Sequence, residues 1–377
     1  MKSGESSYRP LPDDLWWLLK DAVGKGVFPG AAAAIAHGPP ESRGQWMGCC
    51  GREALVPVEK ALDIGTCFDL ASLTKPLATT LAILALVEEG RIALADHLPA
   101  LLEKKVPADK CSISLQQLLC HGSGLPAYHP YFEELATMGV AARREAMLER
   151  ILTEPLAAPS GTRAVYSDLG FMLLGRIVEQ QSGTSLDGFV RERIYQPLGL
   201  DDSLFFRPLA EPPPGGKSFA ATEDCPWRGR VLGGEVSDEN THVLGGVAGQ
   251  AGLFGDVKSV VALAAFLLDC WKDRAVHPAW SNGLLSTFLA REGSIPASTW
   301  ALGFDTPSPT GSSAGSFFHP TSVGHLGFTG TSFWIDPTRD LAVVLLTNRV
   351  HPSRANELIK QFRPLFHNAV FASLGLC

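Results

Sequence analysis

Residues 68–75 read Phe-Asp-Leu-Ala-Ser-Leu-Thr-Lys, and they stand where extended chain gives way to a predicted helix over 72–89 that stops at Gly90. Ser72 precedes Lys75 by three residues, so a helix places both side chains on one face, one turn apart. A serine hydroxyl is a poor nucleophile unless a base accepts its proton, and a partly desolvated lysine can serve as that base. The helix N-terminus also favours negative charge developing at the serine. A chain of this size matches Ser-x-x-Lys about once by chance, so further elements are needed.

Two more stretches downstream carry polar side chains where loops meet predicted elements. Tyr166-Ser167-Asp168 lies just before a predicted helix over 170–183, where the tyrosine can relay a proton beside a lysine. Alone, this stretch also fits a helix start capped by Ser167 or Asp168. Residues 324–331, Gly-His-Leu-Gly-Phe-Thr-Gly-Thr, precede a predicted strand over 331–337. The glycines allow a substrate backbone to approach, and His325 can offer a cation or a donor, although an ordinary hairpin loop fits as well.

Strand patterns occur near both ends of the chain and helical patterns between them. The predicted strands are 30–38, 43–53, 331–337 and 340–350, and helices are expected at 11–23 and 352–370. The middle is mainly helical and rich in loops, with further helices over 115–120, 141–152, 186–195 and 257–273. We therefore expect an α/β (α+β) fold of two domains. A sheet domain comprises residues 1–75 and 296–377, and a mainly helical domain comprises 76–295.

Composition excludes several classes of protein. The 377 residues are 45% hydrophobic and 19% charged with a net charge of −7, which excludes a disordered chain and gives no basic footprint for nucleic acid. The most apolar stretches, at 30–36 and 77–90, are shorter than the roughly 20 residues that span a bilayer, so no membrane association is expected.

The first residues lack the pattern of a signal peptide, so we expect a cytoplasmic protein unless a leader has been removed. The eight cysteines include no Cys-x-x-Cys pair and are expected to be mainly buried small side chains, and no metal site or cofactor is expected.

Taken in order, the three elements resemble the Ser-x-x-Lys, Tyr-x-Asn and Lys-Thr-Gly set of β-lactamases and penicillin-binding proteins. With His325 in the third element, the chain is similar to the class C β-lactamase-related serine hydrolases, which include D-alanyl-D-alanine carboxypeptidases, D-aminopeptidases and carboxylesterases. Further matches lie at residues 68–72, 84–94, 118–126 (Leu-Leu-Cys-His-Gly-Ser-Gly-Leu-Pro), 166–175 and 249–254 (Gly-Gln-Ala-Gly-Leu-Phe). The resemblance covers about residues 15–370 and implies a β-lactamase/transpeptidase-like fold with an antiparallel sheet flanked by terminal helices.

The resemblance implies a role for each matched residue. Ser72 is the acylated nucleophile, Lys75 and Tyr166 share its proton, and Tyr166 also activates the deacylating water. The backbone N–H groups of Ser72 and Phe328 form the oxyanion hole, and Gly327 lies beside them at the substrate. Asp168, His325, Gly327 and Phe328 are the substrate-binding positions. His121, in a loop-forming stretch, is expected to be structural.

Two positions depart from the family pattern. Asp168 replaces an asparagine and can only accept hydrogen bonds when ionised, which favours an ion pair with Lys75 or a substrate amine. His325 replaces a lysine and is mostly neutral at pH 7, which weakens carboxylate recognition. We therefore expect a serine hydrolase of small esters or D-amino-acid amides. A β-lactamase or D,D-carboxypeptidase is the first alternative, and a non-catalytic binding protein on this fold is the second. The sequence leaves the natural substrate and the oligomeric state open.

Overall fold

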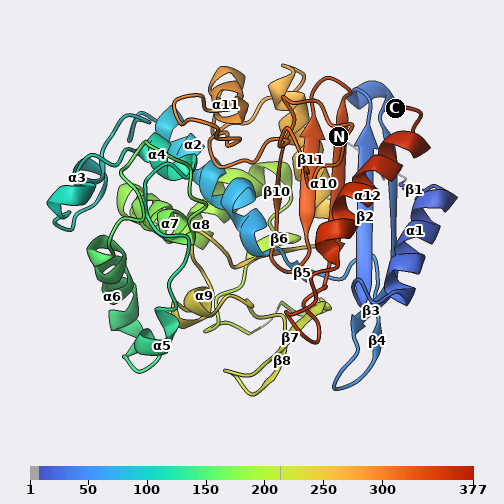
Figure 1. Ribbon diagram of the computed structural model, residues 1–377, viewed down its shortest axis with the longest axis horizontal. Coiled ribbons are helices and arrows are strands. Elements are labelled where there is room, and N and C mark those ends of the chain that lie inside the picture. Colours follow the sequence, from blue (N-terminus) through green and yellow to red (C-terminus); the bar gives the residue numbers. More distant parts are fainter. Residues whose placement is uncertain (1–7, 213) are drawn as a thin grey trace.

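The computed structural model describes residues 8–212 and 214–377, and its centre is a seven-stranded sheet built from both ends of the chain (Figure 1). The strands run in the order β1-β3-β2-β12-β11-β10, and β4 pairs with β3. All neighbouring strands are antiparallel except β1 and β3, which are parallel. The strands are β1 (Arg9–Pro10), β2 (Gly30–His37), β3 (Gly44–Ala54), β4 (Lys60–Ala61), β10 (Val323–Leu326), β11 (Ser332–Asp336) and β12 (Leu341–Thr347).

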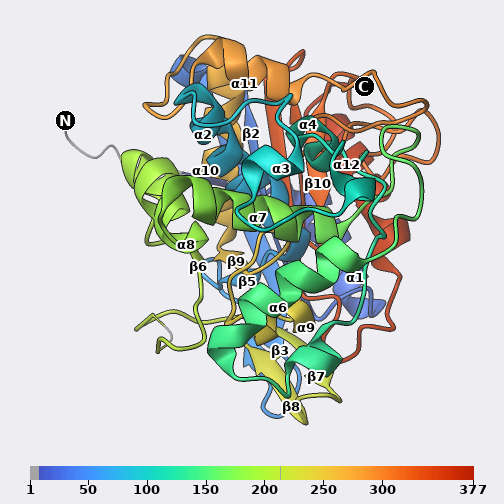
Figure 2. The ribbon, with the colours of Figure 1, turned by 90° about the vertical axis from the view of Figure 1, so that its left-hand side faces the viewer.

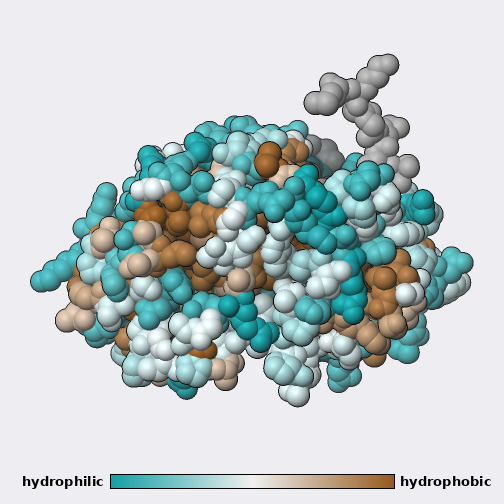
Figure 3. Space-filling view, turned by 90° about the horizontal axis from the view of Figure 1, so that it is seen from above, coloured by the Kyte–Doolittle hydropathy of each residue, from teal (hydrophilic) through white to brown (hydrophobic). Residues whose placement is uncertain are grey.

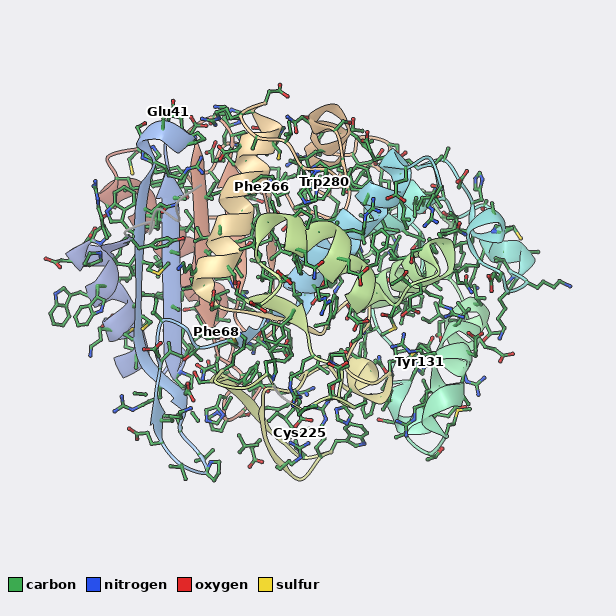
Figure 4. All side chains as sticks on the ribbon, turned by 180° about the vertical axis from the view of Figure 1, so that it is seen from behind. Glu41, Phe68, Tyr131, Cys225, Phe266 and Trp280 are labelled. Atoms are coloured by element: carbon green, nitrogen blue, oxygen red, sulfur yellow. The ribbon has the colours of Figure 1, made fainter. Side chains whose placement is uncertain are left out.

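Helices cover both faces of this sheet. In β2, Ala31, Ala33 and Ile35 pack into a core with α1 (Asp13–Gly24) and α12 (Ile359–Ser373), while the alanines between them face the larger core of the molecule. That opposite face is covered by α10 (Val257–Trp271), which packs on β2, β11 and β12. Figure 4 shows this helix, with Phe266, in front of the sheet. The small side chains of β2 follow from its burial on both faces.

The remaining helices form a block at one side of the sheet, which faces the viewer in Figure 2. Its central element is the helical segment from Ala71 to Glu88, which the sequence predicted as one helix. It begins as a 3₁₀ turn (Ala71–Leu73) and a π turn (Lys75–Thr79) before α2 (Thr80–Glu88). The others are α3 (Leu98–Leu101), α4 (Leu115–Leu119), α5 (Phe132–Leu135), α6 (Val140–Thr153), α7 (Asp168–Ser182), α8 (Leu186–Val190), α9 (Glu239–Val243) and α11 (Asn282–Leu289).

The middle of the chain also contains short strands that the sequence did not predict. A three-stranded sheet has the order β5-β9-β6, and β7 and β8 form a hairpin. With two to five residues each, these strands are too short for an alternating pattern to show in the sequence. They are β5 (Phe68–Asp69), β6 (Leu204–Phe206), β7 (Ala221–Cys225), β8 (Arg230–Gly233) and β9 (Leu253–Gly255).

Two predicted elements differ from the structure. Helix α10 lies inside the range assigned to the helical domain, yet it packs on the sheet, and one large core spans both parts. The helix predicted over 352–370 begins only at Ile359, because Ser353 and Asn356 side chains bond nearby backbone N–H groups and compete with a helical turn. The glycine-rich residues 323–326 form strand β10 instead of a loop. The division into two domains stays a prediction.

Among the described residues, one segment is long and apolar enough to cross a membrane, namely Ala71–Glu88, and 83% of it is buried inside the protein. It is the central helical segment described above. Figure 3 shows a largely hydrophilic upper face with separate hydrophobic patches. All eight cysteines are free, and five of them are buried, in line with the expectation of small buried side chains: Cys50, Cys67, Cys120, Cys225 and Cys270.

Candidate active site

Ser72 lies on a strained turn at the start of the central helical segment. The preceding Ala71 has a φ of +48°, a left-handed conformation that is costly for a residue with a side chain. The turn is held because the buried carboxylate of Asp69 accepts the Ala71 N–H at 2.9 Å and the Ser237 N–H at 2.7 Å. Burial raises the pKa of Asp69 to about 6. The strain is typical of a turn that presents a functional side chain.

Lys75 is fully buried and points its ammonium group at Ser72. Because Ser72 lies on a 3₁₀ turn, a side chain three residues later stands almost directly beside it. Nζ donates to Ser72 Oγ at 3.0 Å and to the Gln250 carbonyl oxygen at 3.1 Å, and it forms an ion pair with Asp168 Oδ1 at 2.6 Å. Burial lowers the pKa of Lys75, but the Asp168 carboxylate and the Tyr166 phenol outweigh it, and the net shift is upward. Lys75 is therefore an ammonium with an acceptor for each of its three donors.

Tyr166 and Asp168 reach the site from the start of α7. Ser167 is the N-cap of this helix, and its hydroxyl accepts the Gly170 N–H at 3.2 Å. The Tyr166 ring lies 5.0 Å from Lys75 Nζ, and its hydroxyl interacts with both Lys75 and Ser72. Burial raises the pKa of Tyr166 despite the neighbouring ammonium, so the phenol is neutral. The sequence expectation that Lys75 pairs with Asp168 agrees with this geometry.

The His121 side chain packs against the segment that carries Tyr166. Its Nδ1 accepts the Ser167 N–H at 3.1 Å, and its ring packs 4.7 Å from Tyr166 and 4.4 Å from Trp300. Burial, and then the Lys75 charge, hold its pKa well below 6.5. These contacts fit the structural role expected for His121.

His325 lies on β10, the edge strand of the large sheet, and is buried beside Tyr166 and Trp300. Burial, followed by the charge of Lys75, lowers its pKa to about 3, so the ring is neutral. Nδ1 lies 2.8 Å from the Leu326 carbonyl oxygen and must donate to it, which leaves Nε2 as an acceptor. The neutral ring agrees with the expectation that His325 is mostly uncharged at pH 7, and it presents an acceptor where a cation or a donor was also considered.

The turn at 327–331 is tied to the Ser72 turn by several bonds. Thr329 Oγ1 donates to the Asp69 carbonyl at 2.8 Å, and Thr331 Oγ1 donates to the Leu70 carbonyl at 3.2 Å. A Cβ at Gly327 would lie 1.9 Å from Thr331 Oγ1, so only glycine permits this approach. Phe328 follows at this turn with its ring half exposed. The N–H groups of Ser72 and Phe328, expected to form the oxyanion hole, thus belong to two linked turns.

Six of the seven predicted site residues line one cleft of about 630 Å³, namely Ser72, Tyr166, Asp168, His325, Gly327 and Phe328. The seventh, Lys75, is buried directly behind Ser72. The sequence reasoning missed several other lining residues. Asp238 and Trp300 lie in stretches without a recognisable pattern, and Arg349 lies at the end of the predicted strand 340–350, where nothing marked it as a site residue. Gln250 stands inside the quoted Gly-Gln-Ala-Gly-Leu-Phe stretch, which is the signal that could have found it.

Comparisons with known proteins agree with this arrangement. The beta-lactamase family model matches residues 18–363. An N-acetylmuramyl-L-alanine amidase of Bacillus subtilis is 34% identical over 316 residues, covering 76% of this chain and 68% of the relative. A putative D-alanyl-D-alanine carboxypeptidase of Escherichia coli K12 is 32% identical over 309 residues, covering 76% and 70%. The octameric penicillin-binding protein homologue from Pyrococcus abyssi has the same fold, with a TM-score of 0.71 at 19% identity over 96% of this chain and 77% of the homologue. With its Ser-x-x-Lys pair at the centre of this fold, the chain belongs to the beta-lactamase family of serine hydrolases.

Proposed function

We propose that the protein forms an acyl-enzyme on Ser72 with small esters or amino-acid amides and then hydrolyses it. The observation that carries this proposal is the placement of Ser72 Oγ 3.0 Å from the Lys75 ammonium, at the wall of an open cleft. A charged lysine beside a serine hydroxyl lowers the cost of forming the alkoxide that attacks a carbonyl.

The charge states of the site favour Tyr166 as a proton relay. Lys75 holds three protons and Tyr166 holds one, so neither accepts a proton without releasing another. In acylation, the Ser72 proton moves to Tyr166 Oη while the phenolic proton of Tyr166 moves to the leaving group. In deacylation, a water proton moves to Tyr166 and the phenolic proton returns to Ser72 Oγ. Lys75 stabilises the negative charge that develops on both oxygens.

The groups around Ser72 disfavour efficient β-lactam hydrolysis. Asp168 is an anion bound to Lys75, where a neutral amide would otherwise both donate to and accept from a substrate amide. His325 is neutral and presents an acceptor, so it supplies no cation for a substrate carboxylate. Esters and amides without a carboxylate beside the scissile bond fit these groups better.

A D,D-carboxypeptidase is the second candidate. Relatives bear that name, and the cleft is also lined by Arg349, Arg354, Lys360 and Arg363, which could hold a terminal carboxylate. Arg354, however, already pairs with Glu223 and Glu239. These ion pairs reduce its capacity for a substrate anion.

Steady-state assays distinguish the candidates. We expect turnover of p-nitrophenyl butyrate and slow or no turnover of nitrocefin and of a diacylated D-alanyl-D-alanine peptide. Ready hydrolysis of nitrocefin or of the peptide, with p-nitrophenyl butyrate inert, would overturn the ester and amide preference.

A further inference from the structure

The Asp69 carboxylate lies next to the turn that carries Ser72, and the proposed proton transfers do not use it. Asp69 is 2% exposed, and its two oxygens accept different backbone N–H groups. Oδ1 accepts the N–H of Ala71, the residue just before Ser72, at 2.9 Å, and Oδ2 accepts the Ser237 N–H at 2.7 Å. Ser237 lines the same cleft and precedes α9. One carboxylate therefore joins the nucleophile turn to another wall of the cleft.

The backbone of Asp69 connects the same turn to the expected oxyanion hole. Its carbonyl oxygen accepts Thr329 Oγ1 at 2.8 Å, and the next carbonyl along the chain, that of Leu70, accepts Thr331 Oγ1 at 3.2 Å. Both threonines belong to the turn 327–331, which supplies the second N–H group of the expected hole. This short segment of chain therefore fixes the position of one N–H group relative to the other.

The turn needs the carboxylate because Ala71 is strained. Its φ of +48° is a left-handed conformation that glycine adopts freely and alanine does not. An alanine that relaxed from this conformation would turn the following peptide group, which carries the Ser72 N–H. The bond from the Ala71 N–H to Asp69 opposes that relaxation. Backbone strain of this kind persists only where the surrounding groups hold it.

The Asp69 charge is buried without a cationic partner. In the part of the chain that the structure describes, no lysine, arginine or histidine nitrogen lies within 4 Å of it. Burial raises its pKa to about 6, against the two backbone N–H groups that lower it, while Asp238 raises it and Arg228 lowers it. Strand β9 and the turn 327–331 approach Asp69 with Phe254 and Thr329, which do not titrate. The folded protein therefore holds this charge at neutral pH at a cost to its stability.

We propose that Asp69 is a positioning residue of the acyl-transfer reaction, whose ionised carboxylate holds Ala71 in its strained conformation and so aligns Ser72 with the turn 327–331. Asp69 exchanges no proton with the substrate and acts only through Ser72. Protonation places an O–H where an acceptor is needed, so one of the two N–H groups loses its partner. Reaction at Ser72 should therefore slow as the pH falls through about 6. The inference rests on the proposed acyl-enzyme function and adds a requirement that the proton relay does not contain.

The first test compares Asp69→Asn with the double variant Asp69→Asn/Ala71→Gly. Asparagine keeps the shape of aspartate but turns an NH₂ group towards one of the two N–H groups, so we expect kcat for p-nitrophenyl butyrate to fall by about tenfold or more, with a smaller change in KM. Glycine adopts the left-handed conformation without strain, so the double variant should recover about threefold or more of this loss. A general loss of stability would not be repaired in this way, because glycine increases the entropy of the unfolded chain.

Three results of this test would count against a proposal. Wild-type kcat in Asp69→Asn overturns the inference while leaving the enzyme in place, and so does a fall in kcat that glycine at position 71 does not reduce. Inertness of the wild-type protein towards p-nitrophenyl butyrate and towards a fluorophosphonate probe overturns the proposed function and the inference together.

The second test leaves Asp69 unchanged and measures acylation by p-nitrophenyl butyrate in stopped flow between pH 5 and 8. The wild-type rate should fall below about pH 6, and Ala71→Gly should reduce this fall because its turn keeps its shape without the carboxylate. Asp305→Asn is the matched control, since Asp305 lines the same cleft and burial raises its pKa to about 6 as well. An undiminished fall in Ala71→Gly, or its disappearance in Asp305→Asn, with folding verified by circular dichroism at each pH, would contradict the role of Asp69.

Discussion

Lys75 is the residue whose charge decides how Ser72 reacts. Burial alone would lower its pKa and make it a general base, as buried lysines often are. In this protein the Asp168 carboxylate at 2.6 Å and the Tyr166 phenol together outweigh burial, so the lysine stays an ammonium. In the proposed mechanism the base function therefore passes to the Tyr166 relay. An aspartate in place of the family asparagine therefore changes the roles within the site and not only the substrate contacts.

Asp168→Asn tests this interpretation. Without the carboxylate, burial dominates and the pKa of Lys75 falls, so we expect the pH dependence of acylation to gain a new inflection below 10.5. The neutral amide can also donate to a substrate carbonyl, so acylation by β-lactams should increase relative to that by esters. Stopped-flow acylation with nitrocefin and p-nitrophenyl butyrate between pH 6 and 10 measures both effects. An unchanged pH profile together with unchanged substrate preference would refute the role given to Asp168.

Tyr166→Phe removes only the relay oxygen. General acid–base catalysis contributes typically 10²–10⁴-fold, so kcat for p-nitrophenyl butyrate should fall within that range while the melting temperature changes little. The fall should be larger for an amide, whose leaving group needs the proton more than p-nitrophenolate does. A variant with wild-type rates on both substrates would exclude Tyr166 from proton transfer.

The side chains at the centre of the site could be predicted from sequence, whereas their surroundings could not. Ser72, Lys75 and Tyr166 occur at spacings and element boundaries that carry chemical meaning. Asp238 and Trp300 lie in irregular loops, and only tertiary folding brings them to the cleft. The neutral state of His325 depends on burial and on a bond to its neighbour's carbonyl, which no local pattern reveals.

At the scale of elements, the turn 327–331 depends on two arginines. Arg349 donates to the Phe328 carbonyl at 2.8 Å and stacks its guanidinium 4.5 Å from the Phe328 ring. Arg363 donates to the carbonyls of Gly327 and Thr331 at 2.8 and 3.0 Å. One arginine just after β12 and one in α12 thereby hold the turn that carries the Phe328 N–H.

Arg349→Lys should loosen this turn without changing the side chains that react at Ser72. Lysine cannot reproduce the planar set of donors, so the Phe328 N–H loses its fixed position. Complete loss of an oxyanion-hole donor costs about 10²–10³-fold in kcat, and we expect a partial loss of about tenfold or more with a smaller change in KM. Arg91→Lys, at an exposed position, is the matched control. Equal kcat in both variants would show that Arg349 does not position the turn.

Helices and strands were predicted correctly from the sequence where their hydrophobic pattern is long and uninterrupted. Helices α1, α7 and α10 and strands β2, β3, β11 and β12 begin and end within a few residues of the prediction. Strand β10 was missed because Gly324 interrupts its pattern; a Cβ there would lie 2.3 Å from the Phe333 carbonyl oxygen. Glycine lowers strand propensity, and at this position it permits close packing instead.

At the scale of the molecule, a sheet from both chain ends with a helical middle was predictable from the order of patterns. The packing of α10 on the sheet was not, because an amphipathic pattern identifies a buried face but not its partner. Successive residues of β2 face two separate cores in alternation. Because most of them are alanines, helices can pack closely on both faces of the strand.

The buried histidines should make the whole protein less stable in acid. His121, His325 and His367 have pKa values lowered by burial, to about 3 for His325 and about 4 for His367. Their stabilising contribution is complete above pH 6.5 and is lost as the pH falls below it, at about 1.4 kcal/mol per pH unit for each histidine. Asp69 and Asp305, with pKa values raised to about 6, oppose this loss only below that pH. Urea unfolding should show a free energy lower by a few kcal/mol at pH 5.5 than at pH 7.5, and equal or higher stability at pH 5.5 would contradict this account.

Whether Ser72 becomes acylated can be measured by intact-protein mass spectrometry with a fluorophosphonate probe. We expect one adduct on the wild-type protein, located on the peptide that contains Ser72, and none on Ser72→Ala. Absence of any adduct on the folded wild-type protein would indicate a non-catalytic member of the fold. An adduct that persists in Ser72→Ala would place the nucleophile elsewhere.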